Sequence, residues 1–440
     1  MPSRPSLFPL SAQDMEGRLT LGSCDAVELA QRFGTPLYVL DEETIRGNAR
    51  QFRREFAERY PDTSIIYACK AFIHPWVARV LAEEGLGMDA VSAGELFILR
   101  QAGFPADKVY LHGNCKTYED ISFALDMGVG RVVVDNLDEL ELLERMVEGK
   151  GKKMRILLRL NPGIDPHTHK FLTTGGVDSK FGFPKPKAEE ALREAMKAKN
   201  LELTGLHFHL GSSIFEVEPY IQAIESVLGF AHRMRKAYGF ILQELDIGGG
   251  FAQPYTLDSP SPPLSYYAEA ITAHLKQGIE DPSPLLVVEP GRSIISRAGV
   301  ALYRVGGRKE TASGRRYILV DGGMGDNIRP LVYGSRYEAV VAGKLREEAT
   351  EKVSIGGKFC EGGDIIANDI FLPEVELGDV IAMPGCGAYC LPLQSNYNAS
   401  LRPAIAVVKN GEAHLIRERE KYEDLVRHDI CGSLEDIPGQ

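Results

Sequence analysis

The stretch SIIYACKAFIHPWVARVLAEEG, residues 64–85, determines how the rest of the chain is interpreted. Its first part is a short apolar run rich in isoleucine, which is typical of a buried β-strand. Its second part has apolar residues at spacings of three and four, which predicts an amphipathic helix. Lys70 stands at the end of the apolar run. The stretch therefore predicts a strand-then-helix unit with a lysine at the carboxyl end of its strand.

The same unit recurs along the chain until about residue 295. Amphipathic segments of helix length follow most of the apolar runs, as at 93–103, 137–147 and 220–239. Eight units of this kind predict an α/β protein built on a (β/α)8 barrel. An open, doubly wound sheet shows the same alternation and remains an alternative. The eight candidate strands lie at 64–70, 87–92, 108–114, 131–136, 155–161, 203–211, 244–250 and 285–291.

The chain beyond residue 296 has a different sequence pattern. Short alternating strands separated by glycine and charged residues predict a C-terminal all-β domain. The segment TPLYVLDEE, residues 35–43, has strand character and precedes the first barrel helix, so we expect this N-terminal strand to complete the C-terminal sheet. The predicted domains are a barrel at 44–296 and a discontinuous β domain at 1–43 and 297–440.

Composition excludes several classes of protein. The 440 residues carry 61 acidic and 50 basic side chains, a formal charge of -11, and no dense basic tract that would bind nucleic acid. No segment approaches the roughly 20 apolar residues of a membrane span, and the start lacks a signal-peptide pattern. Seven scattered cysteines without a CxxC pair predict reduced thiols and no metal site. We expect a cytoplasmic protein with neither a nucleic-acid nor a membrane partner.

Polar residues mark the carboxyl ends of the predicted strands, where barrel enzymes carry their functional groups. Lys70, Asp89, His112, His209 and Glu289 all occupy such positions. A packed core would not require these residue types. The barrel interpretation therefore predicts that they converge on one site.

Two glycine-containing loops follow the last two predicted strands, GGG at 248–250 and EPGRS at 289–293. Loops at these places in a barrel bind phosphate, although a glycine run can also be a simple tight turn. The GxGxxG spacing of a dinucleotide site is absent. A phosphate anchor combined with Lys70, an amine able to form a Schiff base, describes a pyridoxal 5'-phosphate (PLP) site. The carboxylate of Glu289 is placed to keep the pyridine nitrogen protonated.

At this point ten short motifs indicate a family. The chain resembles the fold-type III PLP-dependent decarboxylases, most closely the diaminopimelate decarboxylases, from about residue 35 to residue 410. The motifs occur in the order that this family shows, and their combination is highly specific. They are YACKA, HGNCK, DSKFG, HFHLGSS, DIGGG, EPGRS, DGGMGDNIRP, CEGGD, GAY and SNYN.

The resemblance implies roles for the residues at the cofactor. Lys70 would form the Schiff base, His209 would stack on the cofactor ring, and Asp89 would lie near the Schiff base. His207 and His209 could instead be ordinary core histidines, and Asp89 a carboxylate at a turn or a helix N-terminus. Tyr389 would complete the cofactor site and contact substrate. The remaining contacts on the phosphate or substrate side would come from Ser212, Gly249, Gly250, Gly291 and Arg292.

The resemblance also implies a substrate-binding set from the β domain. Arg292, Arg329 and Tyr333 would hold a distal carboxylate, a task that suits the planar fork of arginine. Glu361 would accept the distal ammonium group of the substrate. Cys360 would enter the site from a neighbouring subunit as a proton donor, or would be a small buried hydrophobe. Members of the family are homodimers with shared active sites, so we expect a homodimer.

The activity implied is PLP-dependent decarboxylation of meso-2,6-diaminopimelate to L-lysine and CO2, the last step of lysine biosynthesis. A decarboxylase for ornithine, arginine or carboxynorspermidine would share the cofactor residues but lack the carboxylate clamp. A racemase of related fold would pair the pyridine nitrogen with arginine instead of Glu289. A PLP-binding regulatory homologue without activity and a barrel hydrolase without a cofactor remain further alternatives.

Three segments depart from the usual family pattern. Residues 360–364 read CEGGD where CESGD is usual, and Ser213 stands where glutamine is common. Residues 333–339 read YGSRYEA, whereas the family stretch usually ends in Tyr-His. None of these changes removes a proposed catalytic group, but all lie near the expected site.

Overall fold

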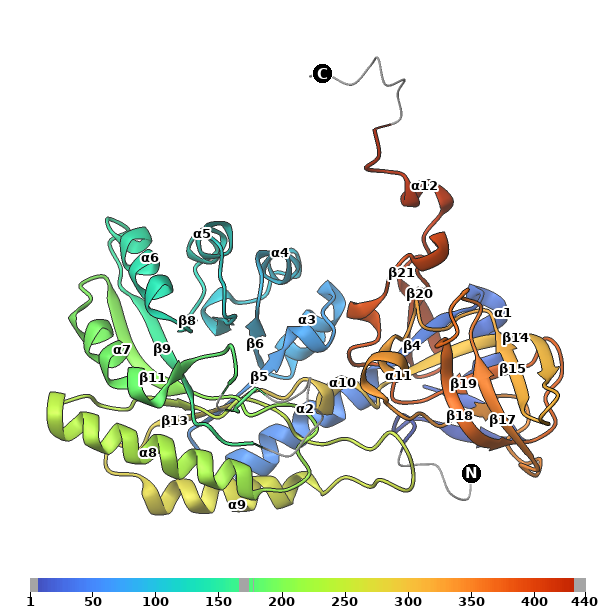
Figure 1. Cartoon of the computed structure of the whole chain (residues 1–440), viewed down its shortest axis with the longest axis horizontal. Coiled ribbons are helices and arrows are strands. Elements are labelled where there is room, and N and C mark those ends of the chain that lie inside the picture. The colour runs from blue at the N-terminus through green and yellow to red at the C-terminus, as the bar shows by residue number, and fades with distance from the viewer. Residues whose placement is uncertain (1–6, 166–173, 177, 431–440) are drawn as a thin grey trace.

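Eight parallel strands close into a barrel that forms the larger part of the molecule (Figure 1). The computed structural model describes residues 7–165, 174–176 and 178–430. Strand β5 pairs with β13 and with β6, and β8 pairs with β9, so the sheet has no free edge. The predicted (β/α)8 barrel is confirmed, and the open doubly wound sheet is wrong. The strands are β5 (Thr63–Ala68), β6 (Gly87–Ala90), β7 (Val109–Leu111), β8 (Arg131–Val134), β9 (Met154–Asn161), β11 (Leu201–His207), β12 (Glu244–Asp246) and β13 (Leu285–Val288).

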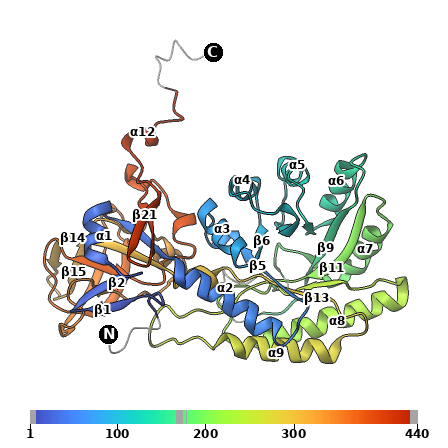
Figure 2. The ribbon, with the colours of Figure 1, turned by 180° about the vertical axis from the view of Figure 1, so that it is seen from behind.

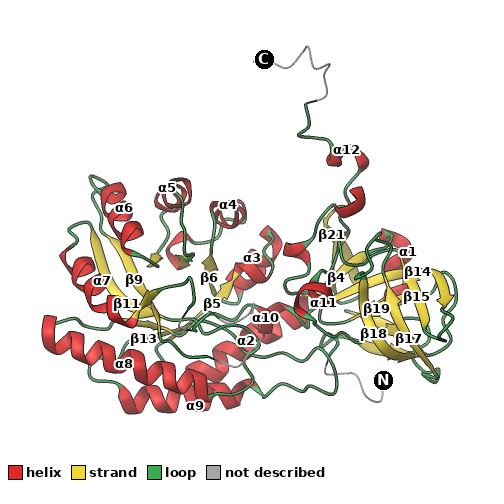
Figure 3. Cartoon of the chain, viewed as in Figure 1, coloured by secondary structure: helices red, strands yellow, loops and turns green. Residues whose placement is uncertain are grey.

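Helices surround the barrel strands, as the colouring of Figure 3 shows. Their apolar faces pack on the sheet and form the main hydrophobic core with it. No helix in the described part of the chain is both long and apolar enough to cross a membrane. The helices are α2 (Glu42–Ala57), α3 (Pro75–Glu83), α4 (Ala93–Gln101), α5 (Tyr118–Met127), α6 (Leu137–Val147), α7 (Lys185–Lys197), α8 (Glu218–Tyr238), α9 (Leu264–Gly278) and α10 (Arg292–Ile295), with the short elements η1 (Cys69–Ala71), η2 (Ala106–Lys108) and β10 (Phe183–Pro184).

Local capping fixes where the barrel helices begin and end. Helix α5 opens with a capping box, in which the side chains of Thr117 and Asp120 each accept a backbone N–H of the first turn. It closes on Gly128, whose φ of 78° is favourable only for glycine. Helix α4 is capped by Ser92. These caps hold the strand-to-helix turns in place, and the turns carry the residues of the site.

The smaller domain is a β domain beside the barrel (Figure 1). Its large sheet runs β18-β17-β15-β14-β4-β20-β21, with β19 and β16 branching from β14. The predicted all-β domain is confirmed. Its elements are β14 (Gly299–Glu310), β15 (Arg316–Val320), α11 (Arg329–Tyr333), β16 (Val340–Val341), β17 (Glu351–Gly356), β18 (Ile365–Leu372), β19 (Val380–Met383), η3 (Leu391–Leu393), η4 (Tyr397–Ala399), β20 (Ala404–Lys409), β21 (Glu412–Arg417) and α12 (Tyr422–Leu425).

The N-terminal segment belongs to the same sheet. Strand β4 (Leu37–Asp41) lies between β14 and β20, antiparallel to the first and parallel to the second, so the expected completion of the sheet is confirmed. Asp41 then caps α2, which carries the chain into the barrel (Figure 2). The structure adds a small sheet and a helix that the sequence did not predict: β1 (Gln13–Met15), β2 (Arg18–Leu21), β3 (Cys24–Asp25) and α1 (Ala26–Phe33). The domain limits stay a prediction, and their ends, 1–6 and 431–440, lie outside the described residues.

Candidate active site

A cavity of about 450 Å³ opens at the carboxyl ends of the barrel strands. Its walls come from both domains, because loops of the β domain reach over the mouth of the barrel. Most of the residues predicted from the sequence line this cavity, among them Lys70, His112, His209, Ser212, Glu289, Arg292, Arg329, Tyr333 and Tyr389.

Lys70 lies in η1, directly after β5, and its side chain borders the cavity. Its Nζ is 3.6 Å from Oδ2 of Asp89, a fully buried carboxylate at the end of β6. Burial would lower the pKa of Lys70, but the Asp89 carboxylate outweighs that effect and raises it above the ordinary value. Ser92 caps α4, so the alternative role of Asp89 as the helix cap is wrong. The Lys70 amine is therefore held in the cavity by a buried counter-charge.

Glu289 follows β13 and lies at the bottom of the cavity with two histidines. Its Oε1 is 3.1 Å from Nε2 of His112 and 3.4 Å from Nε2 of His207. Among the described residues none completes a hydrogen bond to this buried oxygen. Burial would raise the pKa of Glu289, but the two imidazoles lower it well below the usual range. Glu289 thus offers an ionised oxygen to a ligand in the cavity.

A second buried carboxyl group, Asp246, lies behind Glu289. Burial and the Glu289 carboxylate raise the pKa of Asp246 well above its ordinary value. Its Oδ1 accepts the Gly248 N–H at 2.9 Å. Asp246 therefore fixes the glycine loop through this hydrogen bond.

His209 lies beside that loop and is half-buried against the cavity. Its Nδ1 accepts the Gly249 N–H at 3.1 Å, which assigns the ring proton to Nε2. Burial, reinforced by Lys70, lowers the pKa of His209 well below its ordinary value, so the ring is neutral. His207 is fully buried, and neither ring nitrogen has a hydrogen bond among the described residues. Both histidines border the cavity; His209 is the more exposed of the two, and His207 lies close to Glu289.

The glycines of the two loops fit positions that larger residues could not occupy. A Cβ on Gly249 would lie 2.1 Å from the Glu289 carbonyl oxygen, and a Cβ on Gly250 would lie 2.6 Å from the Gly211 oxygen. Gly250 also has a φ of 112°, and Gly291 precedes the short helix α10. None of the three borders the cavity directly in the described residues, so their contact with phosphate stays a prediction.

Arg292 and Tyr389 join the two domains at the edge of the cavity. The Arg292 guanidinium donates to Ser212 Oγ through Nε at 3.2 Å and Nη2 at 3.0 Å, and through Nη1 to the Tyr255 hydroxyl. It also lies 4.7 Å from the centre of the Tyr389 ring. The Tyr389 N–H donates to the Ala71 oxygen at 2.8 Å, which ties this loop to the turn that carries Lys70.

Arg329 begins α11 and reaches the same cavity from the β domain. It is only 3 % exposed, and its guanidinium lies 5.3 Å from the Tyr333 ring and 5.8 Å from the Tyr389 ring. Arg292 and Arg329 therefore place two buried guanidinium groups against the ring of Tyr389.

Cys360 and Glu361 lie elsewhere. Both are exposed, and neither borders the cavity of the described chain. The alternative of a buried, hydrophobic Cys360 is therefore wrong. Asp364 holds this loop by accepting the Met324 N–H at 2.6 Å and the Phe359 N–H at 2.8 Å. The structure thus presents Cys360 and Glu361 on a tethered surface loop.

Two residues at the site escaped the sequence-based prediction. Arg159 lies in β9 and lines the cavity. Tyr255 lies in the loop at 253–265, and its hydroxyl accepts a hydrogen bond from Arg292, which borders the cavity. Arg159 gave a signal, since it interrupts the apolar run RILLRLN at 155–161 and becomes buried. Tyr255 gave none, because its partner Arg292 is set by the tertiary fold.

Comparisons with known proteins agree with this geometry. Residues 43–296 match the family described as pyridoxal-dependent decarboxylase, pyridoxal binding domain. Diaminopimelate decarboxylase from Bacillus subtilis is 41% identical over 429 residues, which cover 96% of this chain and 98% of the relative. The chain belongs to the diaminopimelate decarboxylase family. It is a PLP-dependent carboxy-lyase.

Further members of the diaminopimelate decarboxylase family support the assignment. The enzyme from Actinosynnema pretiosum is 43% identical over 430 residues, with 96% of this chain and 95% of the relative covered. The crystal structure of the enzyme from M. jannaschii in co-complex with L-lysine matches with a TM-score of 0.90 and 33% identity. That match covers 96% of this chain and 98% of the other. The likeness extends through both domains.

The residues of the cavity fit PLP. Glu289 offers a buried oxygen with no hydrogen-bond partner among the described residues, as a protonated ring nitrogen requires. Lys70 offers a primary amine, and the loops around Gly249 leave no space for a Cβ. Facing atoms of His112, His207 and Glu289 lie within 4.8 Å of one another, a spacing that also suits a metal ion. The family assignment identifies the cofactor as PLP.

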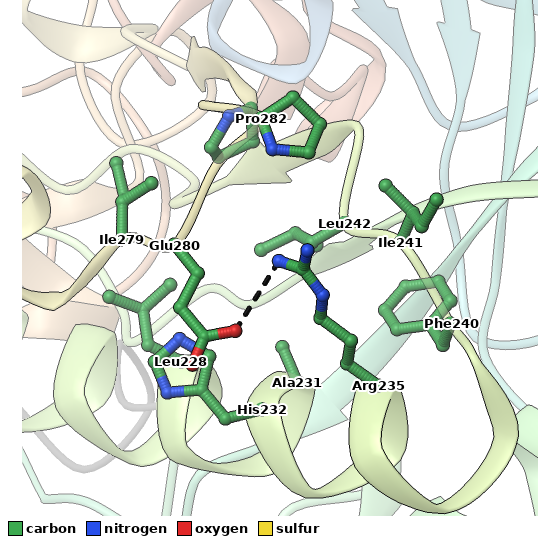
Figure 4. Close-up of a pocket in the computed structure, with 11 residues that line it drawn as sticks. Leu228, Ala231, His232, Arg235, Phe240, Ile241, Leu242, Ile279, Glu280 and Pro282 are labelled. Carbon is green, nitrogen blue, oxygen red and sulfur yellow. Dashed lines mark hydrogen bonds and ion pairs between the residues drawn. The ribbon is translucent and has the colours of Figure 1, made fainter.

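A second, smaller hollow lies away from these residues (Figure 4). It is bounded by α8 and by the segment that follows α9, and the ion pair of Arg235 with Glu280 spans it at 3.3 Å. Its volume of about 30 Å³ is the size of a single water molecule, so it cannot hold an amino-acid substrate.

Proposed function

We propose that this chain decarboxylates meso-2,6-diaminopimelate to L-lysine and CO2, the last step of lysine biosynthesis. The observation that carries the proposal is that Arg292 and Arg329 border the same cavity as Lys70 and Glu289. Two buried guanidinium groups attract a distal carboxylate and repel a distal ammonium group. A substrate that carries only an amine at its far end, such as ornithine, would meet unfavourable charge there.

We assign the chemistry to the following groups. PLP supplies, when bound, an electron sink for the electron pair that remains at Cα after CO2 departs. Lys70 would hold the cofactor through its amine. Asp89, 3.6 Å from Nζ, stabilises the charged form of Lys70 when the amine is free. Glu289 holds a proton at the ring nitrogen from a buried position, where its charge is weakly screened.

The substrate-binding residues decide which carboxylate leaves. Arg329, with Tyr333 beside it, binds the distal carboxylate, so the other carboxylate faces the cofactor. Tyr389 lies between the guanidinium groups and the turn that carries Lys70, which excludes water from the reacting centre. Glu361 of a neighbouring subunit accepts the distal ammonium group, and Cys360 beside it delivers a proton to Cα.

The alternatives require different features. A racemase would place arginine where this chain has Glu289, and a silent homologue would lack Lys70 or the arginine pair. A hydrolase without a cofactor does not account for the family match over residues 43–296. Decarboxylation of ornithine, arginine or carboxynorspermidine remains the competing activity. A comparison of the rates on these substrates and on diaminopimelate distinguishes the two.

Purified protein with PLP is expected to release CO2 from meso-diaminopimelate and to form L-lysine. Ornithine, arginine, carboxynorspermidine and L-lysine should give less than about 1% of that rate. Each of them has a single carboxylate, so the carboxylate that would leave as CO2 has no second one to bind Arg329. Product identity by chromatography and CO2 release give the measurement. CO2 from one of the other amino acids at a comparable rate would preserve the reaction class and contradict the diaminopimelate assignment.

We propose that the working form is a homodimer with shared active sites. The support is that Cys360 and Glu361 are exposed on a tethered loop outside the cavity of their own chain. A twofold dimer would exchange these loops so that each completes the partner's site. We also place the enzyme in the cytoplasm, since the six described cysteines are free thiols; activity confined to a membrane fraction would contradict this.

Mixing two inactive variants tests the shared site. Lys70→Ala and Cys360→Ala should each lose most activity. In a dimer of one subunit of each kind, one active site would have both native residues, Lys70 from one subunit and Cys360 from the other. The second active site would have both alanines. An equal mixture should therefore recover about a quarter of wild-type activity, as random pairing of two subunit types requires. The assay is CO2 release after mixing, with sedimentation to establish the dimer. A mixture that stays inactive although dimers exchange would show that Cys360 does not act across the interface.

A further inference from the structure

Tyr337 is a buried tyrosine beneath the substrate-binding arginine of the β domain. Its side chain is 2% exposed, and its hydroxyl oxygen accepts a hydrogen bond from Nε of Arg329 at 3.1 Å. It belongs to the segment YGSRYEA, in which this chain departs from the Tyr-His ending that is usual in the family. The contact with Arg329 is therefore made within a segment where this chain departs from that family pattern.

The hydrogen bonds of Arg329 fix the direction of its guanidinium fork. Nε donates to Tyr337, and Nη2 donates to Ser335 Oγ at 3.2 Å. Within the described residues, this arrangement leaves Nη1 without a hydrogen bond, and the Arg329 side chain borders the cavity. The fork is thus held along one edge and open along another, which is the arrangement that bidentate binding of a carboxylate needs.

Tyr337 is itself held from behind. Its hydroxyl lies 3.6 Å from Cys390 Sγ, and its ring meets the Tyr255 ring edge-on at 5.1 Å. Cys390 is fully buried, so its contact with the hydroxyl is shielded from solvent. A hydroxyl with a partner on each side has one favourable position. The hydrogen bond from Nε to this hydroxyl therefore orients the Arg329 guanidinium.

The chemistry of the group also matters. Burial raises the pKa of Tyr337 well above its ordinary value, so the hydroxyl is neutral. A neutral acceptor orients a guanidinium without cancelling its positive charge, whereas a carboxylate at this place would neutralise it. The full charge of Arg329 therefore remains available to a substrate carboxylate.

We propose that Tyr337 is a positioning residue for substrate specificity: its hydroxyl orients Arg329 so that the enzyme recognises the distal carboxylate of the substrate. The inference rests on the proposed function and names a residue that strengthens binding of the distal carboxylate. It predicts a loss that depends on the carboxylate of the ligand, and a general loss of structure would not show that dependence.

Two ligands separate these cases. Decarboxylation removes one carboxylate of diaminopimelate, so the product L-lysine retains the carboxylate that faces Arg329. Cadaverine has the same carbon chain and both amines but no carboxylate. Both can reach the cofactor through an amine, and only L-lysine uses Arg329.

The experiment compares wild-type holoenzyme with Tyr337→Phe, which removes one oxygen and keeps the ring. We expect the KM for diaminopimelate and the inhibition constant of L-lysine to rise about tenfold, with kcat within about twofold. The inhibition constant of cadaverine should stay unchanged. Tyr303→Phe is the matched control, because Tyr303 is also a buried tyrosine of the β domain but its hydroxyl lies 3.4 Å from that of Tyr38.

Equal weakening of L-lysine and cadaverine, no weakening of either, or a fall in kcat with unchanged KM would each overturn the proposal. The fate of the proposed function is visible separately, in whether the wild type forms lysine from diaminopimelate. If it does not, changes in cofactor absorbance on binding L-lysine and cadaverine still decide the role of Tyr337.

Discussion

Lys70→Ala is expected to abolish turnover, with a loss of roughly a thousandfold or more, because alanine has no amine to join the cofactor. The near-visible absorbance of PLP bound through lysine should disappear with it. The side chain of Lys70 is 37% exposed to the cavity, so its removal leaves no void in the core. CO2 release and the absorbance spectrum of the dialysed protein give the two measurements.

Two further variants identify what is lost. Lys70→Arg keeps a positive charge beside Asp89 but cannot form a Schiff base, and it should be as inactive as the alanine variant. Lys108→Ala changes an exposed lysine before β7, at the opposite end of the barrel, and should leave both readouts intact. Turnover and absorbance that survive in Lys70→Ala would remove Lys70 from the cofactor site.

The barrel was predictable because its signal is repeated. Each of the eight apolar runs overlaps one strand, since a strand buried on both faces needs a continuous apolar run. The ends of the runs were less accurate. The strand predicted at 244–250 is one example. Strand β12 stops at Asp246, whose side chain accepts the Gly248 N–H, so residues 248–250 form a loop. The polar residues at strand ends came together because a parallel barrel brings all its carboxyl ends to one face.

The parts that escaped prediction depend on contacts between distant segments. Tyr255 lies in a loop rich in proline and serine, and it becomes a site residue only because Arg292 donates to it. Tyr337 was noticed only as a departure from the family pattern, and its contact with Arg329 requires α11 to be placed. Asp246 stood inside a recognised motif, but its role behind Glu289 depends on two strands that lie side by side. Local sequence carries no signal for such pairs.

Glu289→Gln is expected to lower kcat about 100-fold, or by about 2.7 kcal/mol of transition-state stabilisation. Glutamine has nearly the same size but no charge, so it cannot hold a proton on the ring nitrogen. Asp246 does not replace it, because its Oδ1 accepts the Gly248 N–H and holds the glycine loop. The cofactor would remain attached through Lys70 but would accept the electron pair of the leaving carboxylate poorly.

The measurement is kcat for CO2 release, read beside the cofactor absorbance. Absorbance should persist in Glu289→Gln and vanish in Lys70→Ala, which separates loss of the electron sink from loss of the cofactor. Glu202→Gln serves as the matched control, since this exposed residue of β11 pairs with Arg155 at 3.6 Å. A kcat within a few-fold of wild type would mean that the ring nitrogen does not depend on Glu289. The two buried imidazoles would then be the remaining partners, since His112 and His207 border the same oxygen and are neutral by burial.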